Sequence, residues 1–443
     1  MDSVARGTLI NLATRTLSVL LVLAITAIAA RLGTAQQGAF ALFTSVESAL
    51  LALLSGFGIA LARRVSHHGE QPRALVAATV LACIGCGVLA SAALLALSAF
   101  GPPAYRAVWL LALVAPLLLI APNLSGLWLG EGRMLPMARL TLAAPTLTLA
   151  ALAGLWLQRA GSGEAAANDG AALFQVLAAW AAAKAAVAVG VLWVLWRSRR
   201  LARPDLGALW RELPFIATIG ASNLIGILNY RVGIFLVERF LGLAATGVYS
   251  IAVVVAELLW FVSSSLTQAV YGRIGTPDRA QAARTTLRAV HLSLLALLAA
   301  APLVWLGAAL LLPRVLGPDY AQSVPLVALL LPGVLAFGGA SALSAYFTNH
   351  AGQPQVPAQV AALSLAIDAA LSALLIPTLG MRGAALAASV SYALTVALLL
   401  QRFRRHAGLT WRQVLVPEGA LLRQDGLALL RALRLVGAPS APL

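Results

Sequence analysis

Long apolar runs constrain this chain more than any other feature of its sequence. A helix that crosses a bilayer needs about 20 consecutive, mostly apolar residues, and such runs recur between short segments of glycine, proline and charge. By this rule we predict twelve spans, at about residues 9–30, 38–62, 74–100, 105–129, 135–157, 171–196, 213–237, 243–270, 288–312, 322–347, 355–377 and 381–401. Composition agrees, because 61% hydrophobic and 10% charged residues leave too little polar surface for water. We therefore expect an all-α integral membrane protein.

The basic residues predict the orientation of these spans. Most of the 31 lysines and arginines fall near the two chain ends or in alternate loops. The loops on the other side carry one arginine each: Arg31, Arg106, Arg159, Arg239, Arg314 and Arg382. Because positively charged loops stay on the cytoplasmic side, both termini are expected in the cytoplasm.

Two similar stretches indicate an internal duplication. Residues 32–42 read LGTAQQGAFAL and residues 241–251 read LGLAATGVYSI, and GAALF at 170–174 resembles GAALA at 383–387. We predict a six-helix lobe at 1–200, a basic cytoplasmic linker at 201–212, a second six-helix lobe at 213–401 and a basic amphipathic tail at 402–443. The tail is expected either to lie on the inner leaflet or to form a short cytoplasmic helix.

Several classes of protein are disfavoured. A nucleotide-driven pump needs a glycine-rich loop with a lysine, and the only lysine, Lys184, is flanked by alanines inside a predicted span. A membrane glycosyltransferase or polysaccharide polymerase usually carries a large exterior loop with acidic or histidine clusters, and none is evident here. Cys83 and Cys86 lie in an apolar run and are interpreted as packing residues. We expect no enzyme activity, cofactor, metal or nucleic-acid partner.

Three stretches resemble one transporter family. They are N-L-x-x-R followed by ARLGTAQQGAFAL near the start, VLGPDYAQSVPLVALLLPG at 315–333 and IPTLGMRGAALAASVSY at 376–392. Together they resemble the polysaccharide transporter branch, which includes the O-antigen flippases, of the multidrug, oligosaccharidyl-lipid and polysaccharide exporter superfamily. The resemblance extends over all twelve predicted spans and leaves out the C-terminal tail.

The resemblance implies a twelve-helix flippase with two six-helix lobes around a central cavity, working by alternating access. Its cargo would be an undecaprenyl-pyrophosphate-linked oligosaccharide, moved across the bacterial inner membrane from the cytoplasmic to the periplasmic leaflet for O-antigen or exopolysaccharide biosynthesis. Membrane lipids, a polysaccharide polymerase and a chain-length regulator are the further partners considered. A multidrug extruder of the same fold is the nearest alternative.

Basic residues within the predicted spans are the candidate substrate ligands. Intramembrane charges usually face a protein interior or a watery cavity, and guanidinium and ammonium groups bind phosphate oxygens. We therefore assign Arg15, Lys184 and Arg231 to the cargo headgroup. Arg15 and Arg231 could instead extend to the membrane surface, and Arg231 could also pair with an acid.

Polar and acidic residues within spans complete the candidate site. Asn11 and Asn229 are proposed substrate ligands, with helix packing as the alternative. Glu47 and Glu257 lie at nearly matching places in the two repeats, and either neutralise nearby arginines or bind a coupling ion. Asp368 has no basic residue within its own span, which suits a proton or sodium site. A net positive cavity would favour pyrophosphate and an acidic, aromatic one would favour cationic drugs; the sequence leaves this open.

Overall fold

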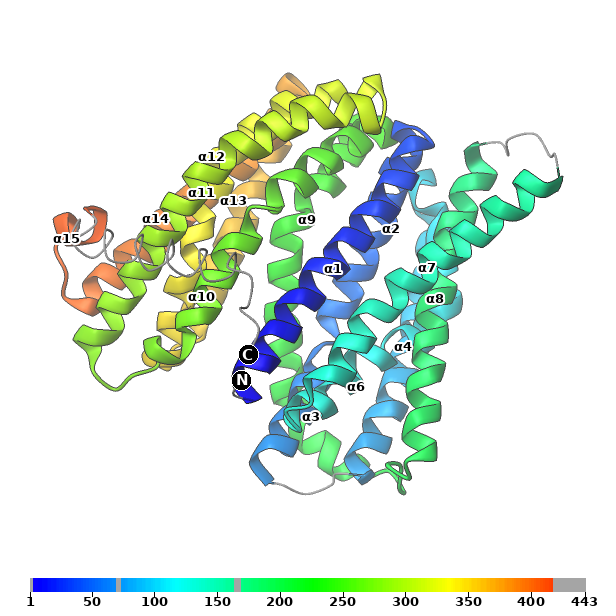
Figure 1. Cartoon of the computed structure of the whole chain (residues 1–443), viewed down its shortest axis with the longest axis horizontal. Helices are drawn as coiled ribbons and strands as arrows, with labels where there is room; N and C mark the ends of the chain where they lie inside the picture. The colour runs from blue at the N-terminus through cyan, green and yellow to red at the C-terminus, as the bar shows by residue number, and fades with distance from the viewer. Residues whose placement is uncertain (1–2, 69–72, 163–168, 417–443) are drawn as a thin grey trace, which may run out of the picture. The chain divides into compact units, whose positions relative to one another are not determined.

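The computed structural model describes residues 3–68, 73–162 and 169–416, and every regular element in them is a helix (Figure 1). The elements are α1 (Ser3–Arg31), α2 (Thr34–Leu53), α3 (Gly56–His68), α4 (Arg73–Phe100), η1 (Pro103–Val108), α5 (Trp109–Leu118), α6 (Ile120–Gly130), α7 (Met134–Ser162), α8 (Asp169–Arg197), α9 (Leu206–Glu257), α10 (Trp260–Ile274), α11 (Arg279–Val315), η2 (Pro318–Gln322), α12 (Ser323–Ala345), η3 (Tyr346–His350), α13 (Gln355–Leu379), α14 (Met381–Ala407) and α15 (Trp411–Leu415). The expected all-α membrane class is confirmed.

Ten helices in the described ranges are long and apolar enough to cross a bilayer, or eleven if the bent pair α2 and α3 forms one span. That pair bends by 41° between Leu53 and Gly56. α9 consists of two helical segments that meet at a kink at Gly242, whose φ of 80° is not helical. This break falls between the predicted spans 213–237 and 243–270. The predicted total of twelve spans remains a prediction.

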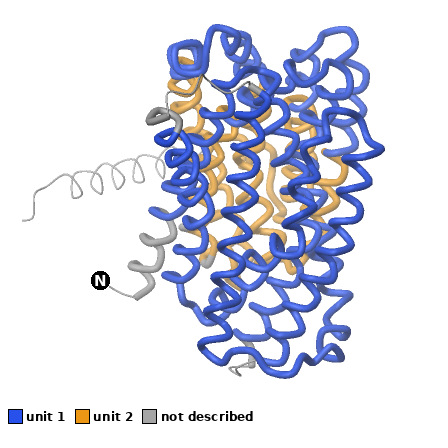
Figure 2. Tube along the Cα trace, turned by 90° about the vertical axis from the view of Figure 1, so that its right-hand side faces the viewer, with its two compact units in different colours: residues 1–254, 307–329, 365–388 blue, residues 255–306, 330–364, 389–443 orange. Residues whose placement is uncertain are grey.

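The helices divide into two compact units (Figure 2). The first contains residues 1–254, 307–329 and 365–388, and the second contains residues 255–306, 330–364 and 389–443. Several long helices, such as α11 and α12, contribute to both units. The division into lobes at 1–200 and 213–401 remains a prediction.

The two repeated stretches pack against each other within the first unit. Gly38 in α2 and Gly247 in α9 lie at equivalent positions of the repeats, and each allows a backbone contact that a side chain would block. A Cβ atom on Gly247 would lie 1.9 Å from the Thr34 carbonyl oxygen, and one on Gly38 would lie 2.0 Å from that of Leu243. The preceding repeat glycines, Gly33 and Gly242, both have positive φ. The duplicated motif thus builds the same turn and the same close contact twice.

Replacing Gly247 by alanine is expected to destabilise the protein strongly, because two backbones would have to separate. Overpacking of this kind costs roughly 1–3 kcal/mol or more. Gly226→Ala on the same helix is the matched control, since a Cβ atom there meets nothing within 4 Å. Thermal unfolding of the two detergent-solubilised variants measures the difference. Equal midpoints would contradict the close contact.

Residues 318–323 form hydrogen bonds to α1 and α9 of the first unit. The Tyr320 hydroxyl donates to the Ala30 carbonyl at 3.1 Å, and the Ser323 hydroxyl donates to the Val248 carbonyl at 2.8 Å. Tyr320 and Ser323 are fully buried. The end of α1, just before the first repeat, and Val248 within the second repeat are therefore each held by a buried hydroxyl from residues 318–323.

The predicted linker at 201–212 is only partly a connection. Residues 206–212 form the first turns of α9, which Asp205 caps by accepting from the Ala208 amide at 2.9 Å. Glu212 forms an ion pair with Arg64 at 3.0 Å, and Arg200 pairs with Glu131 at the end of α6. The segment is tied to neighbouring helices by charge as well as by the chain.

The second unit has its own core. Trp260, Phe337 and Tyr392 form an aromatic cluster with centroids 5.0–6.0 Å apart, and the Trp260 indole donates to the Val334 carbonyl at 3.3 Å. Within the tail expected at 402–443, residues 402–407 continue α14, and the short helix α15 places Val414 in the buried core; the tail's placement at the membrane remains a prediction. Residues 417–443 of the expected amphipathic tail lie outside the described residues.

Candidate functional site

A cavity in the first unit collects several of the predicted site residues. It holds about 740 Å³ of empty space and is lined from α1, α2, α8 and both halves of α9. We call it the polar cavity, because hydroxyl, amide and charged groups share its wall with apolar side chains. Its charged residues are Glu47, Lys184 and Arg231. The remaining wall includes Gln37, Thr44, Ser45, Ser48 and Ser250.

Glu47, Lys184 and Trp180 form one buried cluster at the wall of the polar cavity. The Lys184 ammonium forms an ion pair with Glu47, and the Trp180 indole donates to the other carboxylate oxygen at 2.7 Å. Lys184 also lies 4.5 Å from the centre of the Trp180 ring, a cation–π distance. Phe40 meets that ring edge-on. Glu47 is only 2% exposed. A charge buried this deeply needs a partner, and Lys184 and Trp180 of α8 supply it.

Helix geometry explains this cluster. Trp180 and Lys184 are four residues apart on α8, so their side chains share one face and together reach α2. Lys184 keeps 23% of its side chain exposed while Glu47 keeps 2%. The cation is therefore the member of the pair that remains accessible to a ligand.

Gln37 is a buried polar residue of the same cavity that the sequence analysis did not select. Its amide nitrogen donates to the Ser250 hydroxyl at 3.3 Å, joining α2 to α9. Among the described residues, its amide oxygen has no hydrogen-bond partner although the side chain is 1% exposed. Arg231 lines the same cavity and is partly buried. An unsatisfied buried acceptor beside a cavity indicates room for a donor group of a ligand or for water.

Arg15 lies apart from the polar cavity but on a related helix face. Its side chain is exposed. Val22 and Thr26, which line the cavity, follow it by seven and eleven residues on α1 and so share its face. Arg15 is about 10 Å along α1 from Val22. Asn11 also belongs to α1, but its side chain lies outside the described residues.

The remaining predicted residues are not among those that line the polar cavity. Asp368 in α13 is 2% exposed and accepts a hydrogen bond from the Ser372 hydroxyl at 3.1 Å. Asn229 in α9 is buried. Glu257 is a partly buried residue of the second unit. Across the described ranges, no cluster of three histidine, cysteine or acidic side chains could hold a metal ion.

Trp180 and Asn123 are further residues that the sequence analysis missed. The tryptophan had a signal, its spacing of four from the only lysine. Asn123 is buried; its amide oxygen accepts from the Gly58 amide at 2.9 Å and its amide nitrogen donates to the Leu119 carbonyl at 2.9 Å. It therefore ties α3 to the break between α5 and α6, a structural role with no local pattern to reveal it.

Comparison with known proteins identifies the fold. No family model and no curated protein matches this sequence. The structure is similar to an inward-facing multidrug resistance MATE family transporter of the MOP superfamily (TM-score 0.70, 16% identity, covering 88% of this chain and 94% of that chain). It is also similar to the lipid II flippase MurJ in an inward closed conformation (TM-score 0.70, 12% identity, covering 90% and 87%).

A third similar structure is a MOP superfamily transporter from Pyrococcus furiosus, described as having a binding pocket of reversed polarity that suggests a different function (TM-score 0.64, 16% identity, covering 91% and 95%). All three likenesses span nearly the whole of both chains. The protein is therefore a multi-pass membrane protein with the fold of the MOP superfamily transporters.

Proposed function

We propose that this protein is a flippase that moves an undecaprenyl-pyrophosphate-linked oligosaccharide from the cytoplasmic to the periplasmic leaflet of a bacterial inner membrane. It would work by alternating access, with twelve spans, both termini cytoplasmic and the glycan destined for O-antigen or exopolysaccharide. The shared fold supports a transporter rather than an enzyme.

The charge of the polar cavity is the observation that carries this proposal. Its lining holds two cations, Lys184 and Arg231, and one carboxylate, Glu47. Two cations against one carboxylate leave the lining with one positive charge in excess, and Glu47 is the member already engaged, by Lys184 and Trp180. A pyrophosphate is a compact multivalent anion, and guanidinium and ammonium groups are its usual protein ligands. The serine, threonine and glutamine side chains of the same wall suit sugar hydroxyls.

A multidrug extruder of the same fold is the second candidate, because one of the most similar structures is a multidrug transporter. A cationic drug needs an accessible carboxylate. In this cavity Glu47 is 2% exposed and already paired, so the wall is poorly suited to an organic cation. The electrostatics favour an anionic cargo.

Coupling is proposed to use an intramembrane carboxylate. Asp368 is buried in α13, and none of the ion pairs among the described residues includes it. A buried carboxylate of this kind is suited to gain and lose a proton or sodium ion. Glu257, the repeat equivalent of Glu47, lies in the second unit and is proposed either to bind a coupling ion or to form a charge pair.

Depletion of the protein from its host tests the proposed cargo. We expect undecaprenyl-pyrophosphate-linked glycan to accumulate on the inner leaflet while surface polysaccharide falls, with both restored by re-expression. Unchanged carrier levels together with greater sensitivity to cationic drugs would contradict the flippase and favour the extruder.

A further inference from the structure

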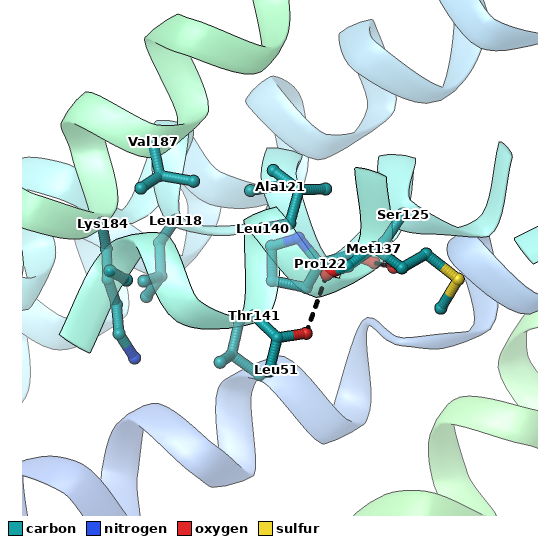
Figure 3. A pocket seen from close by; sticks show the side chains of 11 residues that line it. Leu51, Leu118, Ala121, Pro122, Ser125, Met137, Leu140, Thr141, Lys184 and Val187 are labelled. Carbon is teal, nitrogen blue, oxygen red and sulfur yellow. Dashed lines mark hydrogen bonds between the residues drawn. The ribbon is translucent and has the colours of Figure 1, made fainter. Parts of the chain in front are cut away.

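A second cavity in the first unit lies among α2, α5, α6, α7 and α8, with about 720 Å³ of empty space (Figure 3). We call it the α7 groove, because α7 supplies the longest part of its wall. Met137 and Leu140 of α7 lie across from Lys184 and Val187 of α8 (Figure 3), and Ala144 of α7 also lines the space. Ala121 and Pro122 of α6 contribute further apolar wall.

The hydroxyl groups of the α7 groove are already satisfied. The Ser125 hydroxyl donates to the Pro122 carbonyl at 2.6 Å, and that of Thr141 donates to the Met137 carbonyl at 3.0 Å. Both bonds stay within the residue's own helix. Among the residues lining the groove, Lys184 is the one charged group. Because the two hydroxyls are already bonded, the rest of the wall suits an apolar occupant.

The α7 wall of the groove belongs to a helix that is largely unburied. α7 is the least buried of the ten candidate spans, with 11% of its most apolar window buried inside the protein. Met137 and Ala144 are two turns apart, so the wall extends for about 10 Å along the helix. A wall of this length suits a short stretch of an extended apolar chain, and the low burial of α7 suits entry of that chain from the bilayer.

Lys184 joins the α7 groove to the polar cavity. Lys184 and Leu51 line both spaces. The Lys184 side chain thus borders an apolar groove on one side and a wall of hydroxyl, amide and guanidinium groups on the other, where its ammonium pairs with Glu47. An amphipathic anion with a long apolar tail, a phosphate group and a polar head matches this sequence of environments.

We infer that the α7 groove binds the apolar prenyl chain of the lipid carrier while Lys184 contacts its pyrophosphate and the glycan occupies the polar cavity. This inference rests on the proposed flippase function and adds a tail site to it. The excess positive charge beside the groove, from Lys184 and Arg231 against Glu47, favours an anionic prenyl lipid over a neutral bilayer lipid.

Photolabelling tests the tail site directly. The purified full-length protein in nanodiscs is exposed to undecaprenyl pyrophosphate that carries a diazirine on its prenyl chain, and labelled peptides are mapped by mass spectrometry. We expect labelling on α7 around Met137 and Leu140, displaced by unlabelled undecaprenyl pyrophosphate and not by phosphatidylglycerol. Labelling confined to other helices, or equal displacement by phosphatidylglycerol, would overturn the assignment.

A blocking variant supplies the second test. Ala144→Trp fills the α7 groove and is expected to reduce groove labelling and flipping by at least about tenfold. Ala150→Trp is the matched control, since Ala150 is exposed on α7 and does not line the groove. Normal flipping by Ala144→Trp, in a host where depletion causes carrier accumulation, would overturn the tail site and leave the flippase intact. Absence of accumulation on depletion would overturn the flippase and the prenyl occupant with it.

Discussion

Lys184→Met is expected to lower both the stability of the protein and its transport. A double variant that also removes the Glu47 charge should recover the stability but not the transport. The single change leaves the Glu47 carboxylate 2% exposed and without its cation. Breaking a buried ion pair on one side costs about 3–5 kcal/mol. We therefore expect a large fall in the amount of folded protein.

Glu47→Gln combined with Lys184→Met removes both charges and is expected to recover most of the stability, because no buried charge is left unpaired. A glutamine at position 47 can still accept the hydrogen bond from the Trp180 indole. Transport should stay low in the double variant if the ammonium of Lys184 contacts the cargo phosphate.

The measurement is flipping per folded molecule, together with thermal unfolding in detergent, for both single variants and the double. Arg197→Met is the matched control, because it removes a cation from the end of the same helix, where the guanidinium lies 5.7 Å from the Trp193 ring. A double variant with full transport would mean that the pair has only a structural role.

The fold class could be predicted because span length is a property of single segments. Each helix that crosses a bilayer must satisfy its own backbone hydrogen bonds, so the length of an apolar run directly reports a helix. Gly242 illustrates the limit of this signal. The apolar sequence continues on both sides of it, and the φ of 80° marks where α9 breaks.

The candidate site was harder to predict, because its parts come from distant segments. Glu47 and Lys184 are separated by 137 residues, and their pairing depends on how α2 packs against α8. The sequence analysis expected Glu47 either to neutralise an arginine or to bind a coupling ion; the structure gives it Lys184 and Trp180. Single-residue chemistry identified the charges, while tertiary packing decided their partners.

The repeated glycine motif could be predicted in part: more than the partners of the candidate site, and less than the fold class. Its recurrence was visible in the sequence as LGTAQQG and LGLAATG, but its function was not. Only the packing shows that Gly38 and Gly247 contact the opposite repeat, with Gln37 and Ser250 bonded beside them. The duplication therefore places two backbones together at one side of the polar cavity, where small residues are needed for close approach.

Arg15→Ala is expected to lower transport by about tenfold or more while leaving the amount of protein unchanged. Arg15 is exposed, and no hydrogen bond or ion pair to it is found among the described residues, so its loss removes no structural contact. It lies on the same face of α1 as Val22 and Thr26, which line the polar cavity. A guanidinium at this place can bind an approaching pyrophosphate through paired hydrogen bonds.

The expected loss follows from the strength of that contact. A hydrogen bond to a charged group contributes about 1.5–3 kcal/mol, which corresponds to a fall in flipping of about tenfold or more. Arg15→Lys keeps the charge but loses the planar two-pronged geometry, so partial activity is expected. Arg106→Ala, an exposed arginine of η1 that does not line the cavity, is the control and should transport normally. Wild-type flipping by Arg15→Ala would exclude a required contact with the cargo, and full rescue by lysine would reduce its role to charge alone.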